Sequence, residues 1–300
     1  MWFKNLCVFR LSAPWTLAPG ALEEALSHKP LLPCSGQTAL SRGWVPPRES
    51  GGNCVEALPP HLLIAQGTEE KLLPAAVINQ EAKERAISFE QQRGYKPGRK
   101  QMRDIKDEVT LDLMPRAFAR RKMVRAWLDT EQGWLIVDTG TAAAAENLIE
   151  HLRTTLGDMP GVTLVEPNMA LSATMTEWLA KNQAPGRFQI EDECELVGSD
   201  ETKSTVRYLR HPLNTEEIRK HIAAGKRVSR LALSWNDKLS FVLNDTLQIK
   251  RLKFLDMDAD ASEGSEVDDE QKFEIDFTLM TSELRVMLGE LCAMIGADLN

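Results

Sequence analysis

The stretch RVSRLALSWNDKLSFVLNDTLQIKRLKF, residues 227–254, decides the fold class of this chain. Apolar and polar residues alternate along it, and two short polar turns interrupt the alternation. A period of two is typical of strands that bury one face. The stretch therefore predicts an antiparallel meander of three strands, at residues 227–235, 239–243 and 247–254.

The third predicted strand contains an irregularity. Its apolar positions shift phase, from Leu247 and Ile249 to Leu252 and Phe254. One extra residue in a strand produces such a shift, so we expect a β-bulge near residues 250–251.

Helical periods lie on both sides of the meander. Apolar residues recur every three to four positions from Phe277 to Ile295, which predicts a long terminal helix, and the acidic tract 256–270 before it is expected to be a loop. Upstream, the same spacing over residues 78–89 and 102–113 predicts two helices around the Gly/Pro turn at 94–98. This pair is expected to project as a helical finger.

The remaining segments extend the same architecture. We expect strands at 2–11 and 61–66, a Gly/Pro/Ser-rich loop around 43–47, a β-hairpin at 124–139 and a helix after it. The predicted fold class is α+β, with antiparallel sheets, flanking helices and the projecting finger. The expected regions are an N-terminal α+β region at 1–73, the finger at 74–122, a hairpin and helix continuing the N-terminal unit at 123–165, and a C-terminal α+β region at 166–300.

Composition places the chain among ordinary globular proteins. It has 300 residues, 43% hydrophobic and 27% charged, which excludes fibrous and disordered classes. Apolar runs fall short of the ~20 residues of a membrane helix, and Lys4 and Arg10 interrupt the N-terminal segment where a signal peptide needs an apolar core. We expect a soluble cytoplasmic protein without a membrane partner.

Cysteine and histidine spacing argues against bound metal. The five cysteines form no Cys-x-x-Cys pair, and the five histidines are far apart. The chain is expected to use no metal and no cofactor.

Charge is segregated along the chain. The net charge is −8, yet residues 81–125 carry a net of +6 and residues 202–253 a net of +8, whereas residues 256–276 carry −9. Basic regions within an acidic body are typical of proteins that bind phosphates. The alternative is that these cations only solvate helix and sheet faces.

The basic residues fall into three groups. Five lie between residues 91 and 103 without any acid, at the predicted fingertip, and others lie at 116–122 or in and before the meander, where some fall on the face opposite the core. The candidate DNA-binding residues are Arg93, Lys96, Arg99, Lys100, Arg103, Arg116, Arg120, Arg121, Lys122, Arg207, Lys226, Arg227, Arg230, Lys250, Arg251 and Lys253.

Phe118 is the unusual residue of the second group. In PRAFARRK, residues 115–122, it is surrounded by four cations, which is unfavourable for a core position. An aromatic anchor with a charged rim is typical of interfaces. The alternative is that Phe118 folds back beneath its own strand.

A catalytic alternative rests on Asp138. The sequence LIVDTG, residues 135–140, is similar to the active-site strand of aspartic proteases, whose two carboxylates share one proton. A single copy would need a symmetric dimer, and IGADL at 295–299 is a faint second copy. We favour a strand-to-helix turn, with Asp138 or Thr141 helping to cap the next helix, and otherwise find no catalytic constellation.

Several segments together resemble the RdgC family of bacterial recombination-associated proteins, over essentially the whole chain. They are WFKNL at 2–6, GWVPP at 43–47, EKLLP at 70–74, LMPRAF at 113–118 and KRLKF at 250–254.

The resemblance implies a DNA-binding protein that is not an enzyme. It implies a ring-shaped homodimer that holds double-stranded DNA in a basic hole, opposes RecA in homologous recombination, supports replication fork repair and associates with the nucleoid. Binding of single-stranded DNA stays open. The resemblance also places Phe118 at a subunit contact, with Arg210 and His211 as candidate partners. An aspartic-protease-like hydrolase using Asp138 is the alternative function.

Overall fold

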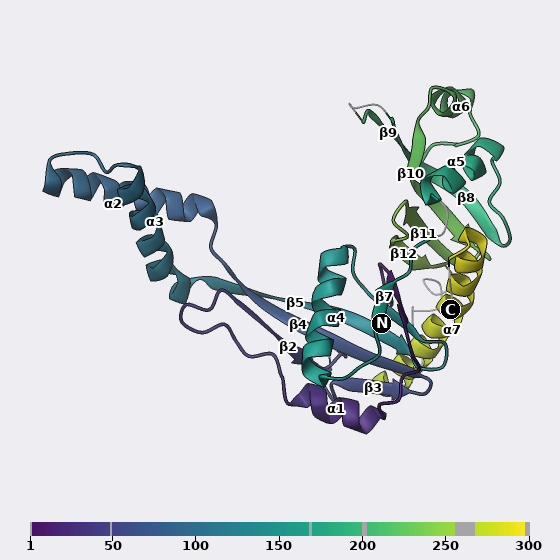
Figure 1. Ribbon diagram of the computed structural model, residues 1–300, viewed down its shortest axis with the longest axis horizontal. Helices are drawn as coiled ribbons and strands as arrows, with labels where there is room; N and C mark the ends of the chain where they lie inside the picture. The colour runs from purple at the N-terminus through teal and green to yellow at the C-terminus, as the bar shows by residue number, and fades with distance from the viewer. Residues whose placement is uncertain (1, 49, 168–169, 200–202, 256–267, 298–300) are drawn as a thin grey trace. The chain divides into compact units, whose positions relative to one another are not determined.

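The computed structural model describes residues 2–48, 50–167, 170–199, 203–255 and 268–297 (Figure 1). The chain divides into two compact units, each described here by itself. Unit 1 contains residues 1–19, 56–63 and 125–300, and unit 2 contains residues 20–55 and 64–124. Helices combine with antiparallel sheets, which confirms the predicted α+β class.

A five-stranded sheet in unit 1 contains the predicted meander. Its order is β12-β11-β10-β8-β9. Leu231, Leu233 and Trp235 face the core, as their alternation predicts. The strands are β8 (Phe188–Val197), β9 (Thr205–Leu209), β10 (Arg227–Trp235), β11 (Leu239–Asn244) and β12 (Ile249–Phe254).

The β-bulge lies where the phase shift predicts it. Ser240 pairs with Lys253 but Val242 pairs with Lys250, so β12 has one residue more than β11 between these pairs. Arg251, within the bulge, has a φ of 54°. This extra residue explains why apolar side chains on either side of it share the core face.

The other sheet has the order β2-β4-β5-β6-β1-β7, and β3 pairs with β4. Two expectations are wrong here. Residues 40–45 form a strand rather than a loop. In this strand Gly43 lies so close to the Leu31 backbone that no Cβ atom would fit. The first strand begins at Cys7 rather than at Trp2. The strands are β1 (Cys7–Leu11), β2 (Leu40–Val45), β3 (Val55–Leu58), β4 (His61–Leu72), β5 (Phe118–Asp129), β6 (Trp134–Val137) and β7 (Val162–Leu164).

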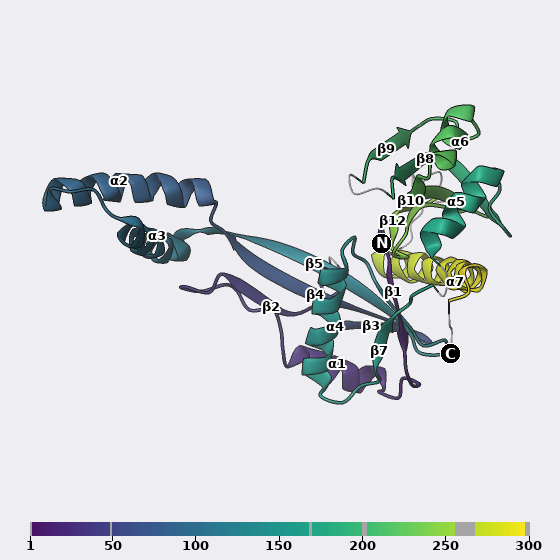
Figure 2. The ribbon, with the colours of Figure 1, turned by 45° about the horizontal axis from the view of Figure 1, so that its top comes forward.

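Helices cover the core of unit 1. α7 packs on the core side of the five-stranded sheet (Figure 2). There Trp235 Nε1–H donates to Glu290 Oε2 at 2.8 Å. None of the helices in the described ranges has both the length and the apolarity to span a membrane. The helices of unit 1 are α4 (Ala142–Leu156), α5 (Leu171–Lys181), α6 (Glu216–Ala223) and α7 (Asp269–Ile295). Besides the hairpin, unit 2 contains nearly all of α1 (Pro19–Ser27) and the 3-10 helix η1 (Met114–Arg116).

The structure describes only the C-terminal end of the acidic loop expected at 256–270. Residues 256–267 lie outside the described residues, and α7 begins at Asp269, so the loop ends earlier than expected.

The two predicted helices of the basic region are confirmed in unit 2. They are α2 (Ala75–Arg93) and α3 (Arg99–Leu113), which pack together through a small core of Ala82, Ala86 and Val109. This core is separate from that of unit 1, so the hairpin depends on few buried contacts.

Candidate nucleic-acid interface

Uncharged groups hold the turn between α2 and α3. Gly94 has a φ of 76°, which glycine adopts readily, and its N–H closes the last turn of α2. Gly98 N–H donates to Gln101 Oε1 at 2.9 Å, and the Tyr95 ring meets the Phe89 ring edge-on with centroids 5.7 Å apart. The charged side chains of this turn are therefore not needed to form it.

Those charged side chains form a free basic cluster, which we call the hairpin tip. All five are exposed, and within the described part of the chain none enters an ion pair. Five exposed positive charges that enter no ion pair attract a polyanion from a distance. The hairpin tip consists of Arg93, Lys96, Arg99, Lys100 and Arg103.

Helix electrostatics point the same way. Arg99 and Lys100 open α3, whose first turn contains no acidic residue. Cations at the positive end of a helix dipole destabilise the helix. The same end attracts phosphates, so this arrangement favours anion binding at the expense of helix stability.

The basic residues at the start of β5 face acids on β4. Arg121 Nε lies 2.5 Å from Glu69 Oε2, while Arg120 and Lys122 approach Glu70 at 3.4 Å and 3.9 Å. Three of the candidate DNA-binding cations are thus partly neutralised within the unit.

Glu69 is held ionised by its partners. Its pKa is lowered by the hydrogen bond from Arg121 and by a second bond from Cys34 N–H, at 2.7 Å.

Arg116, just before β5, is exposed and forms no ion pair among the described residues. It is the freest cation of this group.

The outer face of the five-stranded sheet, opposite the core, carries the third group. Arg207 and Arg230 both pair with Glu195, the latter at 3.7 Å. Arg251 Nη2 lies 2.5 Å from Glu193 Oε1. The pairing of β8 with β9 and β10 brings these acids among the cations.

Glu195 is nearly buried, which alone would raise the pKa of its carboxyl group. Hydrogen bonds from Ser229 Oγ, at 2.7 Å, and from Arg207 outweigh that effect, together with the charge of Arg230, so the pKa is lowered. The carboxylate is a fixed negative charge on this face.

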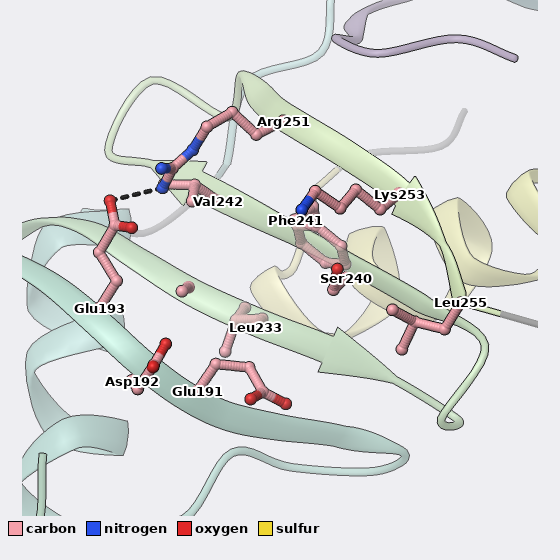
Figure 3. Close-up of a pocket in the computed structure, with 11 residues that line it drawn as sticks. Glu191, Asp192, Glu193, Leu233, Ser240, Phe241, Val242, Arg251, Lys253 and Leu255 are labelled. Atoms are coloured by element: carbon pink, nitrogen blue, oxygen red, sulfur yellow. Dashed lines mark ion pairs between the residues drawn. The ribbon is translucent and has the colours of Figure 1, made fainter. Parts of the chain in front are cut away.

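A shallow cleft of about 320 Å³ lies on the same face (Figure 3). Glu191, Asp192 and Glu193 line one side, and Arg251 and Lys253 the other. The sequence analysis did not include these acids among the site residues, although Glu191, Glu193 and Glu195 alternate along β8 and so share a face. The outer face of the five-stranded sheet therefore carries both acids and cations.

The remaining candidate cations differ in surroundings. Lys226 lies just before β10, and its Nζ donates to Ser204 O at 2.8 Å. Arg227, the first residue of β10, is exposed, whereas Lys250 is half-buried at the bulge of β12. These residues belong to unit 1, and the hairpin tip belongs to unit 2.

Phe118 is not folded back beneath its strand. It is 86% exposed at the start of β5, which removes the core alternative. Arg210, with a φ of 53°, and His211 follow the edge strand β9, and the His211 ring lies 5.3 Å from that of Tyr208. All three residues are accessible at least in part.

Asp138 has a structural role. Its Oδ1 accepts the N–H groups of Lys4, at 3.0 Å, and Asn5, at 2.9 Å. It follows β6 in the predicted strand-to-helix turn, but the expected cap is absent: Thr141 is the N-cap of α4 and makes no side-chain cap bond. Burial raises the pKa of Asp138, although less than it would without these two bonds. Asp138 fastens the N-terminal segment to this turn, and Asp298 lies outside the described residues.

In the described ranges, no group of three or more His, Cys, Asp or Glu side chains is placed to hold a metal ion.

Comparisons with known proteins agree on one family. A family model described as "Putative exonuclease, RdgC" matches residues 1–298. A protein named "Recombination-associated protein RdgC" in Dechloromonas aromatica (strain RCB) is 44% identical to this chain, and the match covers 99% of this chain and 98% of that protein. The protein of the same name in Janthinobacterium sp. (strain Marseille) is also 44% identical, over 100% of this chain and 99% of that protein. The protein of that name in Cupriavidus necator is also 44% identical, over 99% of both chains.

Proposed function

The chain belongs to the RdgC family, and on that premise we propose that it acts in DNA recombination by binding double-stranded DNA through its phosphates. The hairpin tip is the observation that carries this proposal. Its five cations are exposed, enter no ion pair among the described residues and are unnecessary for the turn that presents them. We propose that the α2–α3 hairpin is a finger that captures DNA.

Binding is proposed to be independent of sequence. Phosphate contacts position a protein on DNA but do not read bases. The tip offers flexible Lys and Arg side chains, and its aromatic residue Tyr95 is engaged with Phe89 and Gln101. Counterion release makes such binding salt-dependent, with a slope of about −0.9 per phosphate contact in log affinity against log salt.

We propose a homodimer that closes around duplex DNA, with the exposed ring of Phe118 in one subunit contact. An aromatic side chain that is 86% exposed between cations is suited to an interface pocket. Arg210 and His211 are its proposed partners. A closed ring occupies DNA that RecA filaments also need, which supports antagonism of RecA, a role at replication forks and nucleoid association.

The proposed activity is binding rather than hydrolysis. The carboxylate of Asp138 is engaged by two backbone N–H groups. Incubation of end-labelled linear duplex with the protein and Mg²⁺ tests this: intact label is expected, and progressive release of nucleotides would establish an exonuclease instead.

The main test compares two triple variants in a DNA-binding titration at several salt concentrations. Lys96, Arg99 and Lys100 are changed to Gln in the first. The matched control changes Arg153, Lys181 and Lys220, which are exposed and already paired with acids on their own helices. Both variants lose three positive charges.

The two variants should differ clearly. The tip variant should bind duplex weakly and with a smaller salt slope, whereas the control should bind almost as the unmodified protein does. Equal losses in both would show that only net charge matters and would contradict a specific role for the tip.

A further inference from the structure

β7 is an open edge of its sheet. It pairs with β1 on one side, and Val165 N–H, just after β7, donates to Val8 O at 3.0 Å. Hydrogen-bonded pairs alternate with unbonded pairs along an antiparallel ladder, so the N–H and C=O groups of Val162 and Leu164 point away from β1. Within the described ranges, none of these four groups has a hydrogen-bond partner.

The other terminal strands of the two sheets are protected. Beside β2, Trp44 N–H donates to Lys29 O at 2.9 Å, and beside β12, Leu252 N–H donates to Lys4 O at 2.8 Å. β9 carries Arg207, and a charged residue discourages pairing at an edge. β7 contains no charge and no proline, and in the described part of the chain no segment covers it. Such an edge can accept an added strand.

A pocket of about 500 Å³ lies beside the start of β7. Met159 and Pro160, which come just before the strand, line it together with Trp15, Leu17 and Leu156. Trp15 Nε1–H donates to Leu17 O at 2.9 Å, which fixes the indole ring. The lining is mostly apolar and its aromatic ring is held in place, so the pocket is formed before an apolar side chain enters it.

Acidic residues flank β7 on both sides. Asp158 lines the pocket before the strand, and Glu166 follows the strand by two positions. Both are exposed, and among the described residues neither enters an ion pair. Free acids at both ends of an apolar edge favour a ligand with a cation at each end, and they disfavour DNA.

We propose that β7 is a docking site for an extended peptide segment of a partner protein, apolar in its centre and basic at both ends. The segment adds to the sheet as a strand through its backbone. One apolar side chain fills the pocket, and the basic residues face Asp158 and Glu166. This activity goes beyond DNA binding and uses none of the residues proposed for it.

The three features are needed together. β7 has only three residues, so backbone pairing alone supplies few hydrogen bonds. The pocket adds apolar burial, and the acids add charge complementarity. If the segment runs antiparallel to β7, its C-terminal end lies beside the pocket.

A fluorescein-labelled synthetic peptide tests the site in the absence of DNA. The probe has seven residues, with Lys at both ends, Val at positions two and four, Phe at position six and Thr between them. The apolar side chains of this probe share one face of a strand. Fluorescence anisotropy should show saturable binding, and a control peptide with Glu in place of both Lys should bind about tenfold or more weakly. Absence of saturable binding, or equal binding of both peptides, would overturn the proposal.

Leu164→Pro tests the backbone edge. It removes an N–H that points away from β1, and proline is tolerated at such edge positions. Leu164→Thr keeps the N–H and is the matched control. The proline variant should bind the probe about tenfold or more weakly than the threonine variant, at nearly the same melting temperature. Equal affinities would show that the edge is not used.

Hydrogen exchange in the unmodified protein does not depend on the folding of any variant. The amides of Val162 and Leu164 should exchange about tenfold or more slowly when the probe is saturating, because they become hydrogen-bonded. Bound probe with unchanged exchange at these two amides would place the peptide elsewhere and contradict the proposal.

Charge reversal tests the two acids. Asp158→Lys combined with Glu166→Lys should invert the preference, so that the peptide with Glu at both ends binds more tightly than the probe. The matched control reverses Glu150 and Glu177, which are exposed and paired with cations on their own helices. An unchanged preference in the first variant, or the same inversion in the control, would contradict recognition by these acids.

Sedimentation without peptide identifies the remaining occupant, a second copy of this chain. Leu164→Pro should leave the oligomeric state unchanged, because the proposed occupant is a different protein. A lower oligomeric state in Leu164→Pro than in Leu164→Thr would assign the edge to a second copy and overturn the proposal. No DNA is present in these measurements, so failure of the proposed DNA binding would leave them unaffected.

Discussion

The hairpin tip and the outer face of the five-stranded sheet are both rich in Lys and Arg, but they differ in their acids. The five tip cations have no ion-pair partner among the described residues, whereas Glu193 and Glu195 engage Arg207, Arg230 and Arg251 on the sheet. Counting cations along the chain therefore overestimates the free positive charge of the sheet. Free charge depends on which acids the fold places beside each cation.

The largest expected effect is at the tip. Changing Lys96, Arg99, Lys100 and Arg103 to Ser should weaken duplex binding by about 100-fold at low salt, because several phosphate contacts are lost. The melting temperature should stay nearly unchanged. Thermal unfolding and DNA titration measure both quantities, and unfolding without a separate binding defect would make the tip structural.

The next largest effect separates charge from ring closure. Phe118→Ala should leave the free energy of unfolding unchanged, since the side chain is 86% exposed. It should speed dissociation from circular duplex by about 30-fold, because loss of an aromatic interface anchor costs about 2 kcal/mol of binding free energy. Dissociation from linear duplex is the control. Equal rates from circles for both proteins would show that Phe118 does not hold the ring closed.

A smaller effect concerns the stability of the sheet. Glu195→Gln should lower the free energy of unfolding by about 1–3 kcal/mol, because Arg207 and Arg230 lose their nearly buried partner. The tip variant should show no such loss. Chemical denaturation compares the two.

The same residue gives a pH dependence. The folded-state pKa of Glu195 is lowered from its ordinary value of 4.5, so its stabilisation is present above pH 4.5 and lost as the pH falls through the folded-state value. Between these values the melting temperature should fall more steeply in the unmodified protein than in Glu195→Gln. Parallel curves would show that Glu195 contributes no such stabilisation.

The smallest effect reverses the comparison. Glu193→Gln should free Arg251 from its ion pair and tighten duplex binding by about threefold at low salt if the sheet faces DNA, because one repulsive charge is removed. Glu150→Gln, which frees Arg153 on α4, is the matched control. Unchanged affinity in Glu193→Gln would leave the tip as the main DNA contact.

Sequence periodicity predicted the local elements well. The α2–α3 hairpin, the meander and the bulge beside Arg251 follow from spacing alone, because each concerns residues that are close along the chain. The strand at Leu40–Val45 was missed because its Gly43 and the following prolines suggest a loop. Only the nearby backbone of Leu31 explains the glycine.

The sequence by itself determined where charge and apolar surface occur: five cations without an acid at the hairpin turn, and Phe118 among basic residues. Only the tertiary structure decided which cations remain free, because β8 meets β9 and β10 through long-range pairing. It likewise decided the partners of Asp138, more than 130 positions away in the sequence. Periodicity specifies the face on which a side chain lies, but a neighbour across the fold depends on strand register and packing, which no local pattern contains.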